Sequence, residues 1–241
     1  MSLIVLAVAP AITLLFIFYR LDRRNPEPFW LLIRLYIFGM ISVLPILLVE
    51  TILGIINIFQ FFDTDLNNVY SAFAVAGFSE EIFKWLFVYF IAYKHAAFDE
   101  PLDGIIYSVF VSLGFATVEN ILYVLDGSYS VAITRAILSV PAHMLFAVSM
   151  GYYLSLSKFA MDEKNALFVL KSLVVPIFLH GMYDYILMTR YTFLLLLFIP
   201  YMIWMWIFNL KRLKRYHQIA KNAISVPVYQ EEPYTENQSS Q

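Results

Sequence analysis

The sequence predicts an all-α, polytopic membrane protein with about seven transmembrane helices. Of its 241 residues, 61 % are hydrophobic and only 14 % are charged, and the mean hydropathy is +0.72. Soluble domains carry about 25 % charged residues, so this chain has too little polar surface to cover a globule. Its hydrophobic residues also fall into stretches long enough to cross a bilayer. A soluble enzyme and a disordered chain are therefore excluded.

Seven stretches of about 20 mostly apolar residues are the expected spans. In chain order they are 2–19, 29–50, 69–93, 104–125, 131–157, 168–188 and 191–210. The first stretch lacks the basic start and the cleavage site of a signal peptide, so we expect it to be an anchor. Residues 51–62 are expected either to prolong a tilted helix or to lie along the membrane interface.

The chain divides into a membrane domain and a tail. We expect residues 1–215 to form the integral-membrane domain, with its functional core at about 69–188. Residues 216–241 become increasingly polar and contain proline, which is typical of a disordered cytoplasmic tail.

The distribution of basic residues predicts the orientation of the spans. Eleven of the sixteen fall in alternate connections: Arg20, Arg23, Arg24, Lys94, Lys158, Lys164, Lys211, Arg212, Lys214, Arg215 and Lys221. The other connections hold Asp63, Asp65, Asp126 and, as their clear basic residue, Arg190. Because cytoplasmic loops carry the excess of Lys and Arg, we expect the N-terminus outside and the C-terminus inside.

Charge and cysteine content exclude several functions. The formal net charge is −2, which gives no sign of a nucleic-acid partner, so the lipid bilayer is the expected surrounding. The chain contains no cysteine, which excludes disulfides, thiolate metal sites and a cysteine nucleophile.

Ionisable side chains within the spans are concentrated in the four consecutive stretches between residues 69 and 188. They are Glu80, Glu81, Lys84, Glu119, His143, His180 and Asp184. An ionisable group inside a span costs about 2.5–3.5 kcal/mol on insertion scales, so it indicates a functional site. A rise of 1.5 Å per residue places the carboxylates and histidines among them in a band from the midplane into the outer half of the membrane. We therefore expect four helices around one polar cavity, open towards the outer half, in which His143 faces His180.

The spacing of these residues predicts their pairing. Lys84 follows Glu80 by four residues and Glu81 by three, so the lysine can neutralise one of the two carboxylates. Asp184 follows His180 by four residues, which lets the carboxylate orient the imidazole or lets both bind one metal ion.

One proline and three basic residues of the spans lie outside this cluster. Pro141 lies two residues before His143 and predicts a kink that opens space for water. Arg34, Arg135 and Lys171 lie near span ends, where we expect them to reach the interface without a functional role.

These motifs resemble those of the PrsW family of bacterial intramembrane proteases. The resemblance covers about residues 20–190 and rests on Asp22-Arg23-Arg24-Asn25-Pro26-Glu27-Pro28, Glu80-Glu81-Ile82-Phe83-Lys84, Phe115-x-x-x-Glu119-Asn120, Val-Pro-Ala-His143 and His180-x-x-x-Asp184. The CAAX prenyl endopeptidases of the wider clan are similar, but they favour arginine at the position of Lys84 and histidine at that of Glu119.

The resemblance implies an intramembrane endopeptidase in a bacterial plasma membrane. Such an enzyme makes the first cut in a single-span anti-sigma factor, on the extracytoplasmic side. The cut starts regulated intramembrane proteolysis and releases a sigma factor for an envelope-stress response.

Peptide hydrolysis at this cluster is expected to use direct attack by water. The candidate residues are Glu80, Glu81, Lys84 and Glu119 for catalysis, and His143, His180, Asp184 and Glu119 for a metal ion. A divalent ion, for which zinc is the expected identity, would activate the water while a second glutamate acts as the base. In the metal-free alternative, one of the two adjacent glutamates is the base and the histidines and lysine stabilise the oxyanion. The chain has no HExxH motif, so both alternatives stay open.

Two other functional classes use the same residues. A proton- or ion-coupled transporter would use the cluster as a relay, although the chain lacks the inverted repeat typical of transporters. A non-catalytic scaffold would use the polar side chains only to hold helices together.

Overall fold

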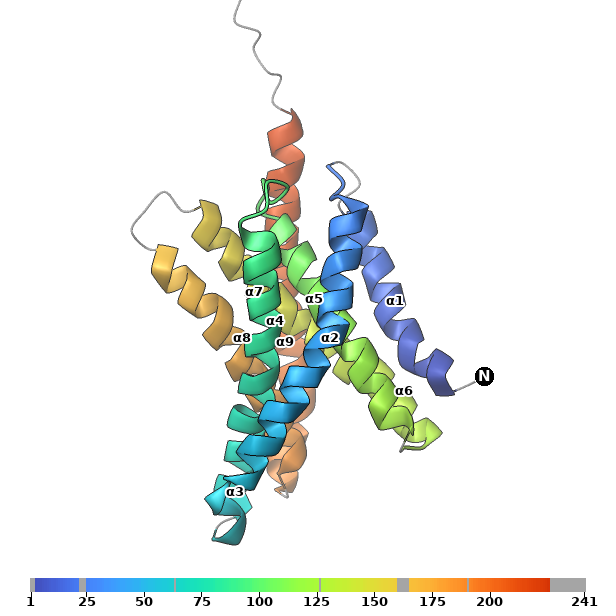
Figure 1. Ribbon diagram of the computed structural model, residues 1–241, viewed down its shortest axis with the longest axis vertical. Helices are drawn as coiled ribbons and strands as arrows, with labels where there is room; N and C mark the ends of the chain where they lie inside the picture. Colours follow the sequence, from blue (N-terminus) through green and yellow to red (C-terminus); the bar gives the residue numbers. More distant parts are fainter. Residues whose placement is uncertain are drawn as a thin grey trace, which may run out of the picture.

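The computed structural model describes residues 3–21, 25–62, 64–125, 127–159, 165–189 and 191–225. Within these ranges the chain is helical and contains no strand, so the all-α prediction is confirmed (Figure 1). The long α-helices are α1 (Leu3–Leu21), α2 (Phe29–Ile55), α5 (Asp103–Leu125), α7 (Ser139–Phe159), α8 (Asn165–Met188) and α9 (Thr192–Ser225). The shorter elements are η1 (Ile58–Phe61), α3 (Thr64–Tyr70), η2 (Ser71–Phe78), α4 (Ser79–Phe87), η3 (Val88–Tyr93) and α6 (Tyr129–Ile137).

Six helical stretches of the described chain are long and apolar enough to cross a membrane. They are Leu3–Leu21, Phe29–Ile55, Asp103–Leu125, Tyr129–Phe159, Asn165–Met188 and Thr192–Gln218. The protein is therefore a polytopic membrane protein. The remaining predicted span, 69–93, lies in a continuous helical run in which α3 and α4 alternate with the π-helical segments η2 and η3. The count of seven spans and their orientation stay predictions.

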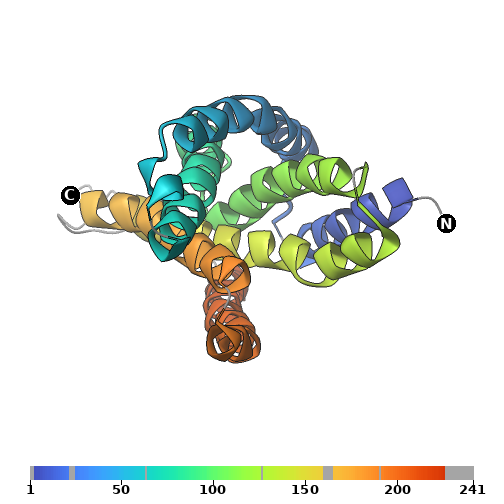
Figure 2. The same cartoon turned by 90° about the horizontal axis from the view of Figure 1, so that it is seen from below.

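Helix α5 forms the centre of the bundle, and its residues Asp103–Thr117 are buried on every side. It packs against α7, α2 and α1 (Figure 2). Two glycines allow a close approach of α5 and α7, because a Cβ atom at Gly151 of α7 would collide with the backbone of Gly104 in α5. Small residues at helix crossings are typical of membrane proteins, where packing drives association.

The expected span 131–157 is not one helix, because α6 ends at Ile137 and α7 begins at Ser139. Pro141 explains this break. Its nitrogen cannot donate to the carbonyl of Ile137, four residues earlier, and its ring would clash with that carbonyl. The predicted kink is thus present as an interruption of the helix at Leu138.

The stretch after the second span prolongs the helix in part, and its position relative to the membrane interface stays a prediction. Helix α2 continues to Ile55, and the 3₁₀ turn η1 follows at Ile58–Phe61. At the other end of the chain, α9 extends to Ser225 and stands to one side of the bundle (Figure 2). The boundary expected at residue 215 therefore falls inside α9, and residues 226–241 of the expected tail lie outside the described residues.

Hydrogen bonds join connections that lie at the same end of the bundle. Lys158 donates to the carbonyl of Tyr93 at 2.7 Å, which joins two of the basic connections. At the opposite end, Tyr191 donates to Asp65 at 2.7 Å. Several residues of the charge pattern lie outside the described residues: Arg23, Arg24, Asp63, Asp126, Lys164 and Arg190.

Candidate active site

Helix α4 carries the two adjacent glutamates and the lysine of the expected site. Glu80, Glu81 and Lys84 are all buried, and Glu81 and Lys84 have no exposed surface. The π-helical segments η2 and η3 flank this short helix on both sides. Wide π turns of this kind occur frequently at functional sites, since they rotate the side chains relative to a regular α-helix.

A close approach of η2 to α8 brings α4 near the second histidine. A Cβ atom at Gly77 would lie 3.1 Å from the backbone nitrogen of Gly181, so only a small residue fits there. Trp85 reinforces the approach by donating to Ser172 of α8 at 2.7 Å. The small residues Gly77 and Gly181 and the Trp85–Ser172 hydrogen bond thus hold α4 close to α8.

The ammonium of Lys84 lies at the centre of the cluster. Its Nζ is 2.9 Å from Oε2 of Glu80, 2.8 Å from Oε1 of Glu81 and 3.3 Å from Nδ1 of His143. It also lies 4.0 Å from the ring centroid of Phe115. The lysine therefore pairs with both carboxylates, whereas the spacing alone predicted only that it can neutralise one.

His143 connects α4 to α5 and α6. Its Nε2 lies 2.9 Å from Oε2 of Glu119, and a guanidinium nitrogen of Arg135 lies 2.7 Å from the same oxygen. Arg135 also donates to Asn120 at 2.9 Å and covers the ring of Tyr123. The sequence predicts that Arg135 reaches the interface, but the break before α7 lets α6 point this side chain towards Glu119.

His180 lies between two carboxylates. Its Nδ1 is 3.1 Å from Oε1 of Glu81, and its Nε2 is 3.2 Å from Oδ2 of Asp184. Phe146 stacks on the imidazole at 4.8 Å. The ring centroids of His143 and His180 are 5.3 Å apart, so the expectation that the two histidines face each other is confirmed.

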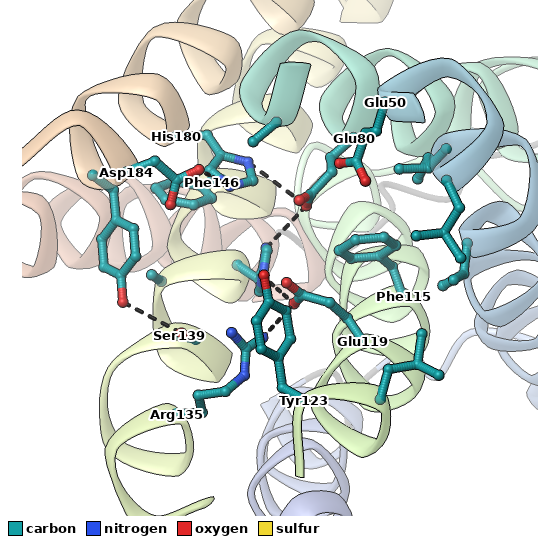
Figure 3. Close-up of a pocket in the computed structure, with 18 of the residues that line it drawn as sticks. Glu50, Glu80, Phe115, Glu119, Tyr123, Arg135, Ser139, Phe146, His180 and Asp184 are labelled. Carbon is teal, nitrogen blue, oxygen red and sulfur yellow. Dashed lines mark hydrogen bonds and ion pairs between the residues drawn. The ribbon is translucent and has the colours of Figure 1, made fainter. Parts of the chain in front are cut away.

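The cluster opens into a cavity of about 610 Å³ (Figure 3). Glu80, both histidines, Glu119 and Asp184 line it, whereas Glu81 lies behind them. Residues near the C-terminal ends of α2, α5 and α8 also contribute: Leu47, Glu50, Leu122, Tyr123 and Met188. The cavity therefore lies towards the end of the bundle that the charge pattern places outside.

The donor atoms of the cluster suit a divalent cation in kind and number. One atom each from Glu80, Glu81, His143 and His180 lie within 4.8 Å of one another, and all four residues are buried. Within the described part of the chain, Oε2 of Glu81 is buried without a hydrogen-bond partner, which leaves it available as a ligand. The set fits a metal ion if Lys84 withdraws, because its ammonium contacts three of the four residues.

The structure brings together every residue that the sequence singled out. The metal-ligand set differs from the predicted one. Glu119 and Asp184 contact the Nε2 atoms of the two histidines, on the side away from the cluster centre. The four donors that lie close together therefore include Glu80 and Glu81 in place of Glu119 and Asp184. Sequence reasoning missed Arg135 and Glu50 in the cavity wall. Both are ionisable residues in or beside a span, which is the signal that could have identified them.

Comparison with known proteins finds a family match over most of the chain. Residues 27–208 match a family model described as PrsW family intramembrane metalloprotease. A protein named Protease PrsW from Geobacillus kaustophilus is 43 % identical over 78 % of this chain and 81 % of its own. Proteins of the same name from Clostridioides difficile and Bacillus subtilis are 38 % and 37 % identical, over 92 % and 89 % of this chain and 94 % and 95 % of theirs. No solved structure matches the chain.

Proposed function

The chain belongs to the PrsW family of intramembrane metalloproteases, and from this premise we propose that it makes the first cut in a single-span anti-sigma factor. It is a peptidase of the bacterial membrane. The cut is placed on the extracytoplasmic side, where it starts regulated intramembrane proteolysis and releases a sigma factor in response to envelope stress. The observation that carries the proposal is the buried cluster of Glu80, Glu81, His143 and His180 beside a cavity at the predicted outer end, with Glu80 and both histidines on the cavity wall.

Glu80 is the general base in this proposal. It lines the cavity, so a water molecule there can reach its carboxylate, whereas Glu81 is enclosed behind it. Glu81 instead holds Lys84 and His180 in place through contacts of 2.8 and 3.1 Å. A positioned base contributes about 10²–10⁴-fold to proton transfer.

The two histidines are held by carboxylates on their outer nitrogens. Glu119 and Asp184 fix the rings of His143 and His180, so both Nδ1 atoms point to the centre of the cluster. Histidines that bind metal commonly have such a carboxylate partner. Of the four clustered donors, Glu81, His143 and His180 would hold a divalent ion, proposed to be zinc, which would polarise water and the scissile carbonyl while Glu80 remains the base. In the metal-free alternative, Lys84 takes over the stabilisation of the oxyanion.

Reconstitution with a labelled single-span peptide tests this function. The protein in vesicles is expected to generate new peptide ends from an anti-sigma-factor segment. Glu80→Gln is expected to lower turnover by about 10²-fold or more, because the amide cannot accept a proton. Glu81→Gln is also expected to abolish cleavage, since it weakens the hold on Lys84 and His180.

Glu100→Gln, outside the cavity, serves as the matched control and should cleave normally. Unchanged turnover in both cluster variants would refute the assignment of these glutamates. Elemental analysis of the purified protein distinguishes the metal-dependent from the metal-free mechanism.

A further inference from the structure

The face of α2 that lines the cavity ends in a carboxyl group that the proposed chemistry does not use. Val43, Ile46, Leu47 and Glu50 contribute to the cavity wall. Their spacing of three, one and three residues places them on one side of the helix. The first three are apolar, and Glu50 lies nearest to the end of α2 at Ile55. The wall is therefore an apolar strip that terminates in an acid.

Glu50 differs from the other carboxylates that line the cavity. Each of the other three has a basic neighbour, in the pairs Glu80–Lys84 at 2.9 Å, Glu119–Arg135 at 2.7 Å and Asp184–His180 at 3.2 Å. Among the residues that the structure describes, none forms a hydrogen bond or ion pair with Glu50. In Figure 3 its side chain lies near Glu80, across the cavity from Asp184 and Arg135.

A half-buried carboxyl group without a partner is costly in a membrane protein. It loses part of its hydration and gains no hydrogen bond inside the protein in return. A side chain that enters the cavity can supply the missing hydrogen-bond donor or cation. The substrate of the proposed protease would bring such a side chain.

We propose that Glu50 binds a Lys or Arg side chain of the substrate and so selects segments whose apolar stretch is followed by a basic residue. This inference rests on the proposed proteolytic function. Glu50 lies five residues before the end of α2, or about 8 Å along the helix, which is near the expected membrane boundary. A single-span substrate whose apolar part contacts Val43, Ile46 and Leu47 would place its first interfacial residue beside Glu50.

A competition between two peptides tests the proposal. Both carry the same labelled single-span segment, and they differ only in a Lys or a Gln at the first interfacial position next to the cut. The wild-type protein in vesicles is expected to cleave the Lys peptide with a kcat/KM about tenfold higher, the range of a charge-assisted hydrogen bond. Glu50→Gln should reduce this ratio to about one, and Glu50→Lys should reverse it in favour of a peptide with Glu at that position.

Asp65→Asn is the matched control, because it removes a carboxylate from the same end of the bundle but not from the cavity wall. It should keep the tenfold ratio. Equal cleavage of both peptides by the wild type, or a preference that survives Glu50→Gln, overturns the role of Glu50 and leaves the proteolytic function intact. Loss of cleavage of every peptide in a folded Glu50→Gln protein also overturns it, because Glu50 then belongs to the chemistry. If the wild type cleaves no peptide, the proposed function itself fails.

Discussion

Seven ionisable side chains form one continuous series of contacts across the bundle, from α6 to α8. In order they are Arg135, Glu119, His143, Lys84, Glu81, His180 and Asp184, and each contact is between 2.7 and 3.3 Å. Acidic groups alternate with basic or imidazole groups along most of the series. Burial of a charge is tolerated only when a partner compensates for the lost hydration, so each member depends on its neighbours.

Lys84 is predicted to compete with a metal ion for the same donors. The Lys84→Met substitution removes the ammonium that contacts Glu80, Glu81 and His143. Without this positive charge, a divalent ion meets less repulsion and gains access to all four donors. The affinity for zinc, measured by chelator competition, is expected to rise by about tenfold or more.

The metal-free form of Lys84→Met should unfold at a lower temperature than the wild type, because two buried carboxylates lose the cation that pairs with them. Bound zinc should raise the unfolding temperature again. Lys94→Met, at an exposed position, is the control and should bind zinc as the wild type does. Weaker or unchanged zinc binding by Lys84→Met would contradict a metal site at these four donors.

Most of the site could be predicted at the residue scale because ionisable residues within spans are rare. The spacing of residues along the sequence also predicted which side chains pair within one helix, such as His180 with Asp184. The sequence could not distinguish Arg135 from a residue that reaches the interface, since its direction depends on the break between α6 and α7. Glu50 is the last residue of an expected span, where a carboxylate is easily taken as belonging to the interface.

At the scale of the elements, hydropathy predicts the first residue of each of the six long apolar stretches to within three residues, because the thickness of the bilayer requires stretches of this length. It does not predict the end of α9, which continues well beyond residue 210. Internal irregularities are less predictable. Pro141 indicated the break that separates α6 from α7. Neither η2 nor η3 has a comparable signature in the sequence, although these π-helical segments flank α4, which carries the two glutamates.

The crossing of α5 and α7 is predicted to tolerate no larger residue at Gly151. The added methyl group of Gly151→Ala would meet the backbone of Gly104 and Ile105, which cannot rotate away as a side chain can. Overpacking of this kind costs about 1–3 kcal/mol, so the midpoint of thermal unfolding in detergent should fall.

Cleavage by Gly151→Ala should fall as well, because α7 carries His143 and α5 carries Glu119. Gly54→Ala is the matched control, since nothing lies within 4 Å of its added methyl group. It should unfold at the wild-type temperature or above it, because alanine favours helix more than glycine does. A Gly151→Ala protein as stable as Gly54→Ala would show that this crossing is not closely packed.

At the scale of the whole molecule, the position of the cavity gives the orientation of the chain a functional meaning. The cavity wall includes the C-terminal ends of α2, α5 and α8, which all lie at one end of the bundle. The charge pattern places that end outside, and an extracytoplasmic cut requires this orientation. If the chain were reversed, the same site would open towards the cytoplasm.

The absence of cysteine from the chain allows a direct test of this orientation. Single cysteines at two exposed positions outside the long helices report on the two ends. Ser130→Cys lies at the start of α6 beside the cavity end, and Ala96→Cys lies in the connection between η3 and α5. In intact cells, a maleimide that does not cross membranes is expected to label Ser130→Cys and to leave Ala96→Cys unlabelled.

After the cells are permeabilised, both cysteines should react, which shows that each is accessible in the folded protein. The wild type is the control for background, because it contains no thiol. Labelling of Ala96→Cys alone in intact cells would reverse the orientation and place the cavity on the cytoplasmic side. An extracytoplasmic cut would then be excluded, while the chemistry of the Glu80, His143 and His180 cluster would be unaffected, since it depends only on contacts within the bundle.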